Sequence, residues 1–360
     1  MAQKWFFEKM ERIDALAHTI ITGTPILEAL KKVNMPPIYT ALIVDSENRL
    51  KGILSDGDFR RGLLNGHDLS NPVDVFMNHD PTTALDSTAQ ENAEYLLRSK
   101  SLACLPLVAQ DGTLKKLLIS NSAQHKSKED NTAVIMAGGK GSRLYPLTKD
   151  CPKPMLKVNG KPILEILIEQ CIQAGFSNFY ISVNYLKEQI IDYFGNGDGM
   201  GASINYLFED QPMGTAGSLQ LLPKSINKPF LVLNGDLLTN FNYRHVMQFH
   251  ADHKPSATMC VREHLTQIPF GVVQTDGHRL IGFEEKPTYR QFVNAGVYVI
   301  DPDILSYLEP DTPTDMPTLL ADVQASEQQV MVCPIHEYWL DIGRPETLNI
   351  AQLEWTSLGR

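Results

Sequence analysis

Residues 134–156, VIMAGGKGSRLYPLTKDCPKPML, place a glycine-rich turn directly after a short apolar run. Glycines in such a turn let backbone N–H groups approach phosphate oxygens without a side chain in the way. The turn does not fit the two common phosphate-loop patterns. A G-x-G-x-x-G pattern starting at Gly139 would need glycine where Leu144 stands. A Walker loop would need Ser or Thr after Lys140, but Gly141 follows. The turn therefore predicts a phosphate site of another kind.

Basic side chains gather in the same stretch, although the chain as a whole is acidic. The 360 residues carry 42 acidic and 32 basic side chains, a net charge of −10, which argues against broad binding to nucleic acid. Arg143 offers a planar guanidinium group that suits a polyphosphate. Lys153 lies between two prolines, which fix the backbone while the ammonium group projects. We expect both side chains to contact phosphate; the alternative for Lys153 is an ordinary solvated loop lysine.

The elements that must position these residues alternate between apolar strands and amphipathic helices. Strands are expected at residues 132–139, 178–185, 202–210 and 229–238, and helices at 163–175, 187–197 and 218–223. This order predicts a Rossmann-like mixed sheet, mostly parallel, with helices on both faces. Ligands of such sheets bind beyond the carboxyl ends of the strands, and the glycine-rich turn lies at one of these ends.

Three further segments of the second half have polar residues or glycines at strand ends. Asp236 follows the strand in VLNGDLL, and Asp341 lies in WLDIGRPE. The segment EDQPMGTAGSL, residues 209–219, has glycines that allow a close backbone approach to a ligand. Each has a structural alternative, because a lone Asp after a strand is more often a turn or cap residue, and a glycine-rich turn often precedes a helix.

The pattern GGKGSRLYPLT…CPKPMLKVNGKPIL closely resembles the signature of sugar-1-phosphate nucleotidyltransferases, and the resemblance extends over residues 131–360. It implies the nucleotide-diphospho-sugar transferase fold. It also implies catalytic roles for Arg143, Lys153 and Asp236, and a Mg²⁺ ion held by Asp236 and Asp341. The nucleotide-binding residues that the resemblance implies are Ala137, Gly138, Gly139, Gly141, Gly214, Thr215 and Gly217. The residues that it implies for the sugar phosphate, from the segments PFGVV, FEEKP and VNAGVYV, are Gly271, Glu285, Lys286, Asn294 and Gly296.

The resemblance also implies a reaction, in which a nucleoside triphosphate and a sugar-1-phosphate give a nucleotide sugar and pyrophosphate. The P-x-G-T-A-G loop is more similar to loops of guanylyltransferases than to the G-L loops of many thymidylyl and uridylyl relatives, so GTP is the expected donor. Glucosamine-1-phosphate, mannose-1-phosphate and a heptose-1-phosphate remain open as acceptors. The alternatives are thymidylyl or uridylyl transfer, or a nucleotide sensor without turnover.

The first half contains a weak internal repeat of helix, strand, turn and strand, which resembles a tandem pair of CBS modules. Such modules commonly bind adenine nucleotides and often associate with each other, so a regulatory nucleotide and a homodimer are compatible with this half. Ser55 and Asp58 match the family's nucleotide motif, whereas the second copy has Ala123 in place of the Asp. The alternative is that Ser55 and Asp58 cap a helix that starts nearby.

The polar run near the middle of the chain predicts a domain boundary. The expected domains are a CBS pair at 1–122, divided into about 10–68 and 69–122, a linker at 123–130 and a transferase domain at 131–360. Five scattered cysteines, none in a C-x-x-C pair, argue against a disulfide framework. With no signal peptide and no apolar run long enough to span a bilayer, the sequence predicts a cytoplasmic protein without membrane contact.

Overall fold

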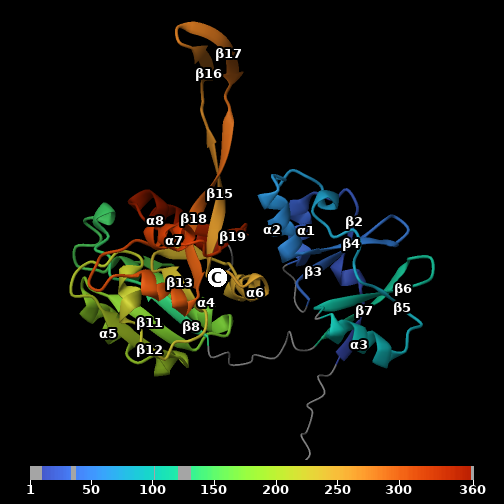
Figure 1. The fold of residues 1–360 in the computed structure, drawn as a ribbon, viewed down its shortest axis with the longest axis horizontal. Coiled ribbons are helices and arrows are strands. Elements are labelled where there is room, and N and C mark those ends of the chain that lie inside the picture. Colours follow the sequence, from blue (N-terminus) through green and yellow to red (C-terminus); the bar gives the residue numbers. More distant parts are fainter. Residues whose placement is uncertain (1–9, 34–37, 101, 121–130, 358–360) are drawn as a thin grey trace, which may run out of the picture. The chain divides into compact units, whose positions relative to one another are not determined.

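The computed structural model of the chain describes residues 10–33, 38–100, 102–120 and 131–357 (Figure 1). Contacts between residues divide the chain into two compact units, residues 1–126 (unit 1) and 127–360 (unit 2). The predicted linker at residues 123–130 lies outside the described residues, as does Ala123. The predicted domain limits therefore stay a prediction.

Unit 1 contains the same succession of elements twice. The first copy consists of β2 (Thr19–Ile21), α1 (Ile26–Val33), β3 (Thr40–Val44) and β4 (Leu50–Ser55). The second consists of β5 (Ala84–Leu85), α3 (Gln90–Ser99), β6 (Cys104–Val108) and β7 (Leu114–Ser120). In each copy the first strand pairs parallel with the second, and the second pairs antiparallel with the third. Helix α2 (Asp56–Leu64) follows β4, and β1 (Met10–Ile13) pairs with β7.

Unit 2 is built on a sheet of seven strands, and this sheet is mixed, as the sequence predicts. Its strands, in spatial order, are β12 (Ser203–Phe208), β11 (Asn178–Val183), β8 (Thr132–Met136), β13 (Phe230–Asn234), β18 (Thr288–Ile300), β15 (Ala257–Gln267) and β19 (Val330–Ile335). The first four strands run parallel to one another, and β15 runs parallel to β19. Strand β18 is antiparallel to both of its neighbours, which makes the sheet mixed.

Helices cover both faces of this sheet, because alternate strand residues are apolar on each face. Ala133 and Ile135 point into a core with α4 (Ile163–Gln173), α5 (Lys187–Phe194), α6 (Tyr243–His253) and α8 (Pro345–Ser357). Val134 points into a second core with α7 (Met316–Ala325) on the opposite face. The helix predicted at residues 218–223 is a 3₁₀ helix, Gly217–Leu221, on that face. None of the helices formed by the described residues has the length and apolar character that crossing a bilayer requires.

Strands β15 and β18 run beyond the sheet as a two-stranded ribbon, which we call the arm (residues 263–292). The arm projects from unit 2, and its tip is formed by β16 (Gly271–Asp276) and β17 (Arg279–Glu285) (Figure 1). None of the strands expected from the sequence, at residues 132–139, 178–185, 202–210 and 229–238, belongs to this ribbon. The ladder of the arm is regular, with no irregularity from the pair Val261–Asn294 to the pair Gln267–Thr288.

Candidate functional site

The register of two parallel strands brings the predicted phosphate residues together. Met136, the last residue of β8, is the partner of Asn234, the last residue of β13. The backbone N–H of Gly235 then donates to the carbonyl oxygen of Met136 at 2.9 Å. The glycine-rich turn that follows β8 and the loop that carries Asp236 therefore start side by side at the carboxyl edge of the sheet.

The glycine-rich turn packs closely on the segment that carries Lys153. Gly141 has a φ of 62°, a left-handed conformation that glycine adopts without strain. A Cβ atom added to Gly141 would lie only 2.9 Å from the Cβ of Lys153. The hydroxyl of Thr148 donates to the carbonyl oxygen of Gly141 at 2.9 Å and holds the turn in this position. A larger residue at 141 would separate the turn from the lysine.

Lys153 is buried rather than solvated. It opens a short 3₁₀ turn, Lys153–Met155, and its ammonium group forms an ion pair with the carboxylate of Asp236. The alternative of an ordinary solvated loop lysine is therefore wrong. A buried ammonium group needs a counter-charge, which Asp236 supplies.

A small antiparallel ladder places Asp341 beside Asp236. Strand β14 (Leu237–Thr239) pairs with β20 (Trp339–Asp341), and Leu237 is the partner of Asp341. The backbone N–H of Ile342 also donates to the carbonyl oxygen of Asp236 at 3.0 Å. Two carboxylates about a hundred positions apart in the sequence thereby become neighbours.

The two carboxylates place two negative charges side by side. Burial, and then the nearby charge of Asp236, raise the pKa of Asp341, while Lys153 and Arg143 act in the opposite direction. Adjacent carboxylate oxygens are the ligands that hard divalent cations prefer in proteins. The side chains present here therefore fit a divalent metal ion.

A cavity of about 310 Å³ lies at this edge of the sheet. Nine of the predicted residues line it, namely Ala137, Gly138, Gly139, Gly141, Arg143, Lys153, Gly214, Thr215 and Asp236. The glycine-rich turn, the lysine and one carboxylate therefore face the same space. Asp341 does not line the cavity, but Gly343 does, and a Cβ atom added there would lie 3.4 Å from the carboxylate of Asp341.

The GTAG turn has structural contacts as well as its place on the cavity wall. The backbone N–H of Thr215 donates to the carboxylate of Asp315 at 3.1 Å, and that of Gly217 donates to the carbonyl oxygen of Thr314 at 3.0 Å. Gly217 is buried and does not line the cavity. The alternative of a purely structural turn before a helix therefore fits Gly217. Gly214 and Thr215 have structural contacts too, but they also face the cavity.

Glu209 faces the same cavity and is not among the site residues predicted from the sequence. Its carboxylate accepts hydrogen bonds from the hydroxyl of Ser182 and, at 3.1 Å, from the backbone N–H of Met213. The side chain is buried, and a Cβ atom added to Gly138 would lie 2.8 Å from both carboxylate oxygens. The signal that could have found it is its position, directly after β12 at the carboxyl edge of the sheet.

The structure divides the residues predicted for the sugar phosphate into two groups. Asn294 and Gly296 lie near the cavity, because a Cβ atom added to Gly296 would meet Asn234, which lines it. The side chain of Asn294 accepts from the backbone N–H of Gly296 at 2.9 Å. Gly271, Glu285 and Lys286 belong instead to the arm, where Glu285 and Lys286 are exposed. They do not line the cavity.

Ser55 and Asp58 form a capping box at the start of α2, which begins at Asp56. The Ser55 hydroxyl accepts from the backbone N–H of Asp58 at 3.2 Å, and the Asp58 carboxylate accepts from the backbone N–H of Ser55 at 2.9 Å. The capping alternative is therefore confirmed. Asp58 also lines a polar cavity of about 420 Å³ in unit 1, with Arg61, Asn65 and His67 among its other residues, so a ligand role for Asp58 stays open to test.

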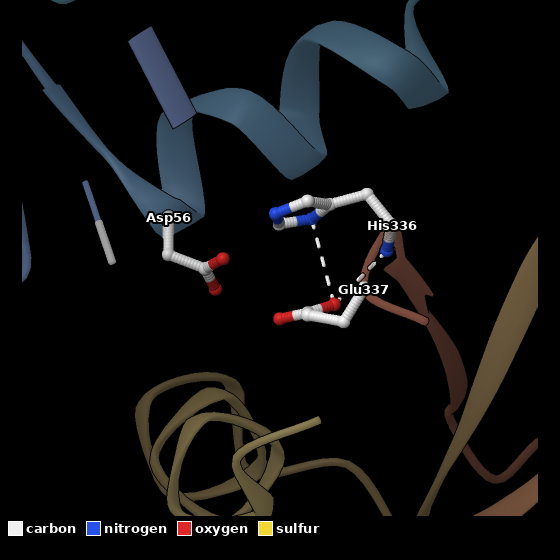
Figure 2. A group of neighbouring side chains, drawn as sticks. All are labelled: Asp56, His336 and Glu337. Carbon is white, nitrogen blue, oxygen red and sulfur yellow. Dashed lines mark hydrogen bonds and ion pairs between the residues drawn. The ribbon is translucent and has the colours of Figure 1, made fainter. Parts of the chain in front are cut away.

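A histidine–glutamate pair lies between β19 and β20, outside the cavity lining. Figure 2 shows the His336 ring beside the Glu337 carboxylate, with 3.5 Å between Nδ1 and Oε2. The backbone N–H of His336 donates to the same carboxylate oxygen at 3.0 Å. Asp56, also drawn there, belongs to unit 1. Within unit 2 the pair is a local contact of the loop that leads to Asp341.

Comparison with known proteins identifies the family. The family model described as nucleotidyl transferase matches residues 132–357, more than half of the chain. The chain belongs to this family. A model of the CBS domain matches residues 17–65, which contain the first copy of the repeat in unit 1. Members of the nucleotidyl transferase family generally use a divalent metal ion, in agreement with the carboxylate pair of Asp236 and Asp341.

Curated relatives resemble the transferase half. The catalytic subunit beta of a mannose-1-phosphate guanylyltransferase from Drosophila pseudoobscura pseudoobscura is 33% identical over 223 residues, 59% of this chain and 59% of the relative. The corresponding subunit from Dictyostelium discoideum is 31% identical, over 59% of this chain and 61% of the relative. The chain therefore spans about three fifths of the length of the curated relatives it matches.

A solved structure agrees on the fold. HddC from Yersinia pseudotuberculosis superposes with a TM-score of 0.50 at 25% identity, over 62% of this chain and 99% of that chain. The matched share corresponds to a single transferase unit, which supports the description of unit 2 as the family's fold.

We predict that Lys153→Met destabilises unit 2, because Asp236 loses its ion-pair partner and the nearby carboxylate of Asp341 loses the same cation. The free energy of unfolding should fall by about 1–3 kcal/mol, less than for a fully buried pair because Asp236 is partly exposed. Chemical denaturation followed by tryptophan fluorescence measures this change. Adding Mg²⁺ should raise the melting temperature of the variant more than that of the wild type.

Lys157→Met is the matched control, because Lys157 is exposed on the same segment. It should leave both the stability and the response to Mg²⁺ at wild-type values. Equal stability of the Lys153 variant and the wild type in metal-free buffer would contradict the account of this charge cluster.

Proposed function

We propose that this chain is a sugar-1-phosphate nucleotidyltransferase that transfers GMP from GTP to a hexose- or hexosamine-1-phosphate and releases pyrophosphate. The observation that carries the proposal is that the glycine-rich turn, Arg143, Lys153 and Asp236 line one cavity at the carboxyl ends of β8 and β13. Backbone N–H groups, two cationic side chains and a carboxylate in one cavity suit a triphosphate that is about to be cleaved.

In this reaction an oxygen of the sugar phosphate attacks the α-phosphorus of GTP. The new P–O bond forms as the bond from the α-phosphorus to the bridging oxygen breaks, and pyrophosphate leaves with the bonding electrons. The attacking phosphate is already ionised near neutral pH, so no side chain must act as nucleophile or general base. The main obstacle is repulsion between two anions, and Arg143 and Lys153 are the side chains that reduce it. The backbone of residues 137–141 holds the phosphates in place.

We propose Mg²⁺ as the metal ion, with Asp236 and Asp341 as its protein ligands. When bound, Mg²⁺ supplies charge neutralisation at the phosphate oxygens. Lys153 orients Asp236 before the substrates arrive, through the ion pair described above. Gly343 leaves space next to the carboxylate of Asp341, at the cavity wall.

Glu209 supports the choice of guanine. An ionised carboxylate only accepts hydrogen bonds, and this one keeps a free acceptor position on each oxygen besides those used by Ser182 and Met213. Guanine presents N–H donors from its ring nitrogen and its amino group along one edge, which suits two carboxylate oxygens. Uracil and thymine present one N–H between two carbonyl oxygens, which a carboxylate would repel. The names of the curated relatives, mannose-1-phosphate guanylyltransferases, point to the same base.

The acceptor is proposed at the level of its class. Mannose-1-phosphate is supported by the names of the relatives, while glucosamine-1-phosphate and a heptose-1-phosphate remain candidates. Asn294 is the proposed sugar-binding side chain closest to the cavity. It lies two residues before Gly296, which packs against Asn234 in the cavity wall. We place the reaction in the cytoplasm, because the odd number of scattered cysteines fits a reducing compartment. We propose that the nucleotide sugar is used in the synthesis of surface glycans.

A pyrophosphate-release assay tests the function. We expect Mg²⁺-dependent release with GTP and at least one of mannose-1-phosphate, glucosamine-1-phosphate and a heptose-1-phosphate, with UTP, dTTP and CTP at least about tenfold slower. A faster rate with dTTP or UTP would establish the same reaction with another base. If no pair of substrates releases pyrophosphate, the chain is a nucleotide sensor and the proposed activity is wrong.

We predict that Glu209→Gln lowers kcat/KM for GTP by about 10- to 100-fold, the effect of losing a charge-assisted hydrogen bond in a buried site. The rate with UTP or dTTP should rise relative to GTP, because the amide NH₂ group of glutamine donates hydrogen bonds, which a carboxylate cannot do. Asp210→Asn is the control, because the neighbouring carboxylate is exposed and does not line the cavity. An unchanged ratio of GTP to UTP rates in the Glu209 variant would overturn its role in base recognition.

We further propose that residues 1–122 form a CBS pair whose cavity at Asp58 binds a regulatory nucleotide. The CBS match at residues 17–65 and the polar cavity support this proposal. In the full chain, an adenine nucleotide should bind with a Kd that Asp58→Asn weakens about tenfold. It should also change the transferase rate of the wild type. Absence of both binding and a rate change with AMP, ADP and ATP would contradict the proposal.

A further inference from the structure

Asn234, the last residue of β13, is a polar residue of the cavity wall that has no part in the reaction described above. Its amide oxygen is buried and has no hydrogen-bond partner among the described residues. A buried amide oxygen without a partner is costly, and native proteins rarely keep one without a functional reason. Because the side chain lines the cavity, a donor that arrives with a ligand would supply the missing hydrogen bond.

Gly296 leaves room for the side chain of Asn234. Gly296 has a φ of 68°, and a Cβ atom added to it would lie 2.7 Å from Nδ2 and 3.2 Å from Cβ of Asn234. A larger residue at 296 would therefore push the amide out of its position. The terminal torsion of an asparagine has broad minima, so rotation about χ2 can turn the amide oxygen toward a ligand at small cost. The packing thus fixes the place of the side chain and leaves this one rotation available.

The order of the strands separates Asn234 from the side chain proposed to bind the base. Glu209 follows β12, the edge strand of the sheet, and β11 and β8 lie between β12 and β13. These spacings of about 4.8 Å each put the ends of β12 and β13 roughly 14 Å apart, whereas β18 lies directly beside β13. Leu233 is the partner of Val297 in β18, which brings Asn234 beside Gly296. Asn234 therefore lies at the end of the cavity where the acceptor residues Asn294 and Gly296 are found.

The neighbouring side chain of Asn294 is already bonded to the protein. Its amide oxygen accepts from the backbone N–H of Gly296 at 2.9 Å, and its amide nitrogen donates to the hydroxyl of Tyr298 at 2.6 Å. One lone pair and one N–H of this amide remain for a sugar. The oxygen of Asn234 offers both of its lone pairs, because no described residue donates to it. Of the two asparagines, Asn234 is the one that lacks a donor.

We propose that Asn234 determines acceptor specificity, because its amide oxygen accepts a hydrogen bond from one hydroxyl of the sugar ring of the sugar-1-phosphate. This inference rests on the proposed function, which places the acceptor in this cavity. Asp236, two residues after Asn234, is a proposed ligand of the metal ion at the reacting phosphates, so the ring attached to the attacking phosphate comes next to Asn234. The acceptor class is a sugar phosphate with a free hydroxyl at the position that Asn234 contacts.

Monodeoxy analogues of the acceptor test this contact. The parent is whichever of mannose-1-phosphate, glucosamine-1-phosphate and heptose-1-phosphate supports pyrophosphate release, and each analogue lacks one hydroxyl. The wild type should discriminate against one analogue by about 10- to 100-fold in kcat/KM, because that analogue leaves a buried acceptor unpaired. Asn234→Ala should lose about the same factor with the parent and turn over that analogue as fast as the parent. Discrimination by Asn234→Ala that equals that of the wild type would overturn the contact.

Asn205→Ala is the matched control, because Asn205 is an exposed asparagine of β12 that does not line the cavity. It should keep the wild-type rate and the wild-type discrimination. The melting temperature of Asn234→Ala should stay within about 4 °C of the wild type, since the amide oxygen makes no hydrogen bond within the described chain. A larger fall would make Asn234 a structural residue and overturn the proposal.

The donor substrate provides the competing assignment. We expect Asn234→Ala to keep a KM for GTP within about twofold of the wild type, and the same ratio of GTP to 2′-deoxy-GTP rates. If Asn234 instead accepts from a ribose hydroxyl, KM for GTP rises or the ratio changes, and either result would overturn the acceptor contact.

A binding measurement separates this proposal from the proposed function. If the wild type releases no pyrophosphate with any pair of substrates, the function is wrong, and calorimetric titration of the full chain with the three sugar phosphates decides the contact. Binding that Asn234→Ala weakens at least tenfold would retain it. Absence of binding, or equal binding by the variant and the wild type, would overturn it.

Discussion

The alignment of two strand ends is the constraint on which the site of unit 2 depends. Met136 and Asn234 are partners in neighbouring parallel strands, and the backbone of Gly235 is bonded to Met136. A Cβ atom added to Gly235 would lie 2.7 Å from the carbonyl oxygen of Met136, so the contact requires glycine. A shift of one residue would exchange the faces of the strand and move Asp236 away from the glycine-rich turn. The chemistry therefore rests on a register set by apolar residues of the sheet.

Charge at this edge is arranged in alternation. Lys153 meets Asp236, Asp236 meets Asp341, and Arg143 adds a second cation nearby. Neither sign dominates, so the cluster can stay folded without ligand, and its carboxylates remain available to a metal ion. A cavity lined only by cations would bind a triphosphate more tightly but would repel the metal ion that family members generally use.

Contiguous motifs at strand ends could be predicted from the sequence, because the carboxyl edge of a parallel sheet follows from the order of its elements. The glycine-rich turn and Asp236 are of this kind. Asp341 needed the family resemblance, since only the β14–β20 ladder makes it a neighbour of Asp236. The role of Glu209 depends on Ser182, on a different strand, and therefore has no local signature. The arm could not be predicted from the sequence. Its residues have the pattern of ordinary strands, and nothing in this pattern shows that β13 and β19, which flank β18 and β15 in the sheet, end before the arm begins.

The fixed position of Glu209 has a thermodynamic consequence. Ser182 and Met213 hold its carboxylate in one orientation beside Gly138, so its rotamer entropy is lost when the chain folds. A free glutamate side chain loses about 1–2 kcal/mol on being immobilised. A ligand that hydrogen-bonds to Glu209 does not bear this loss, and more of the hydrogen-bond energy appears as affinity. The folding of unit 2 thus prepares an acceptor whose selectivity does not depend on rearrangement at the moment of binding.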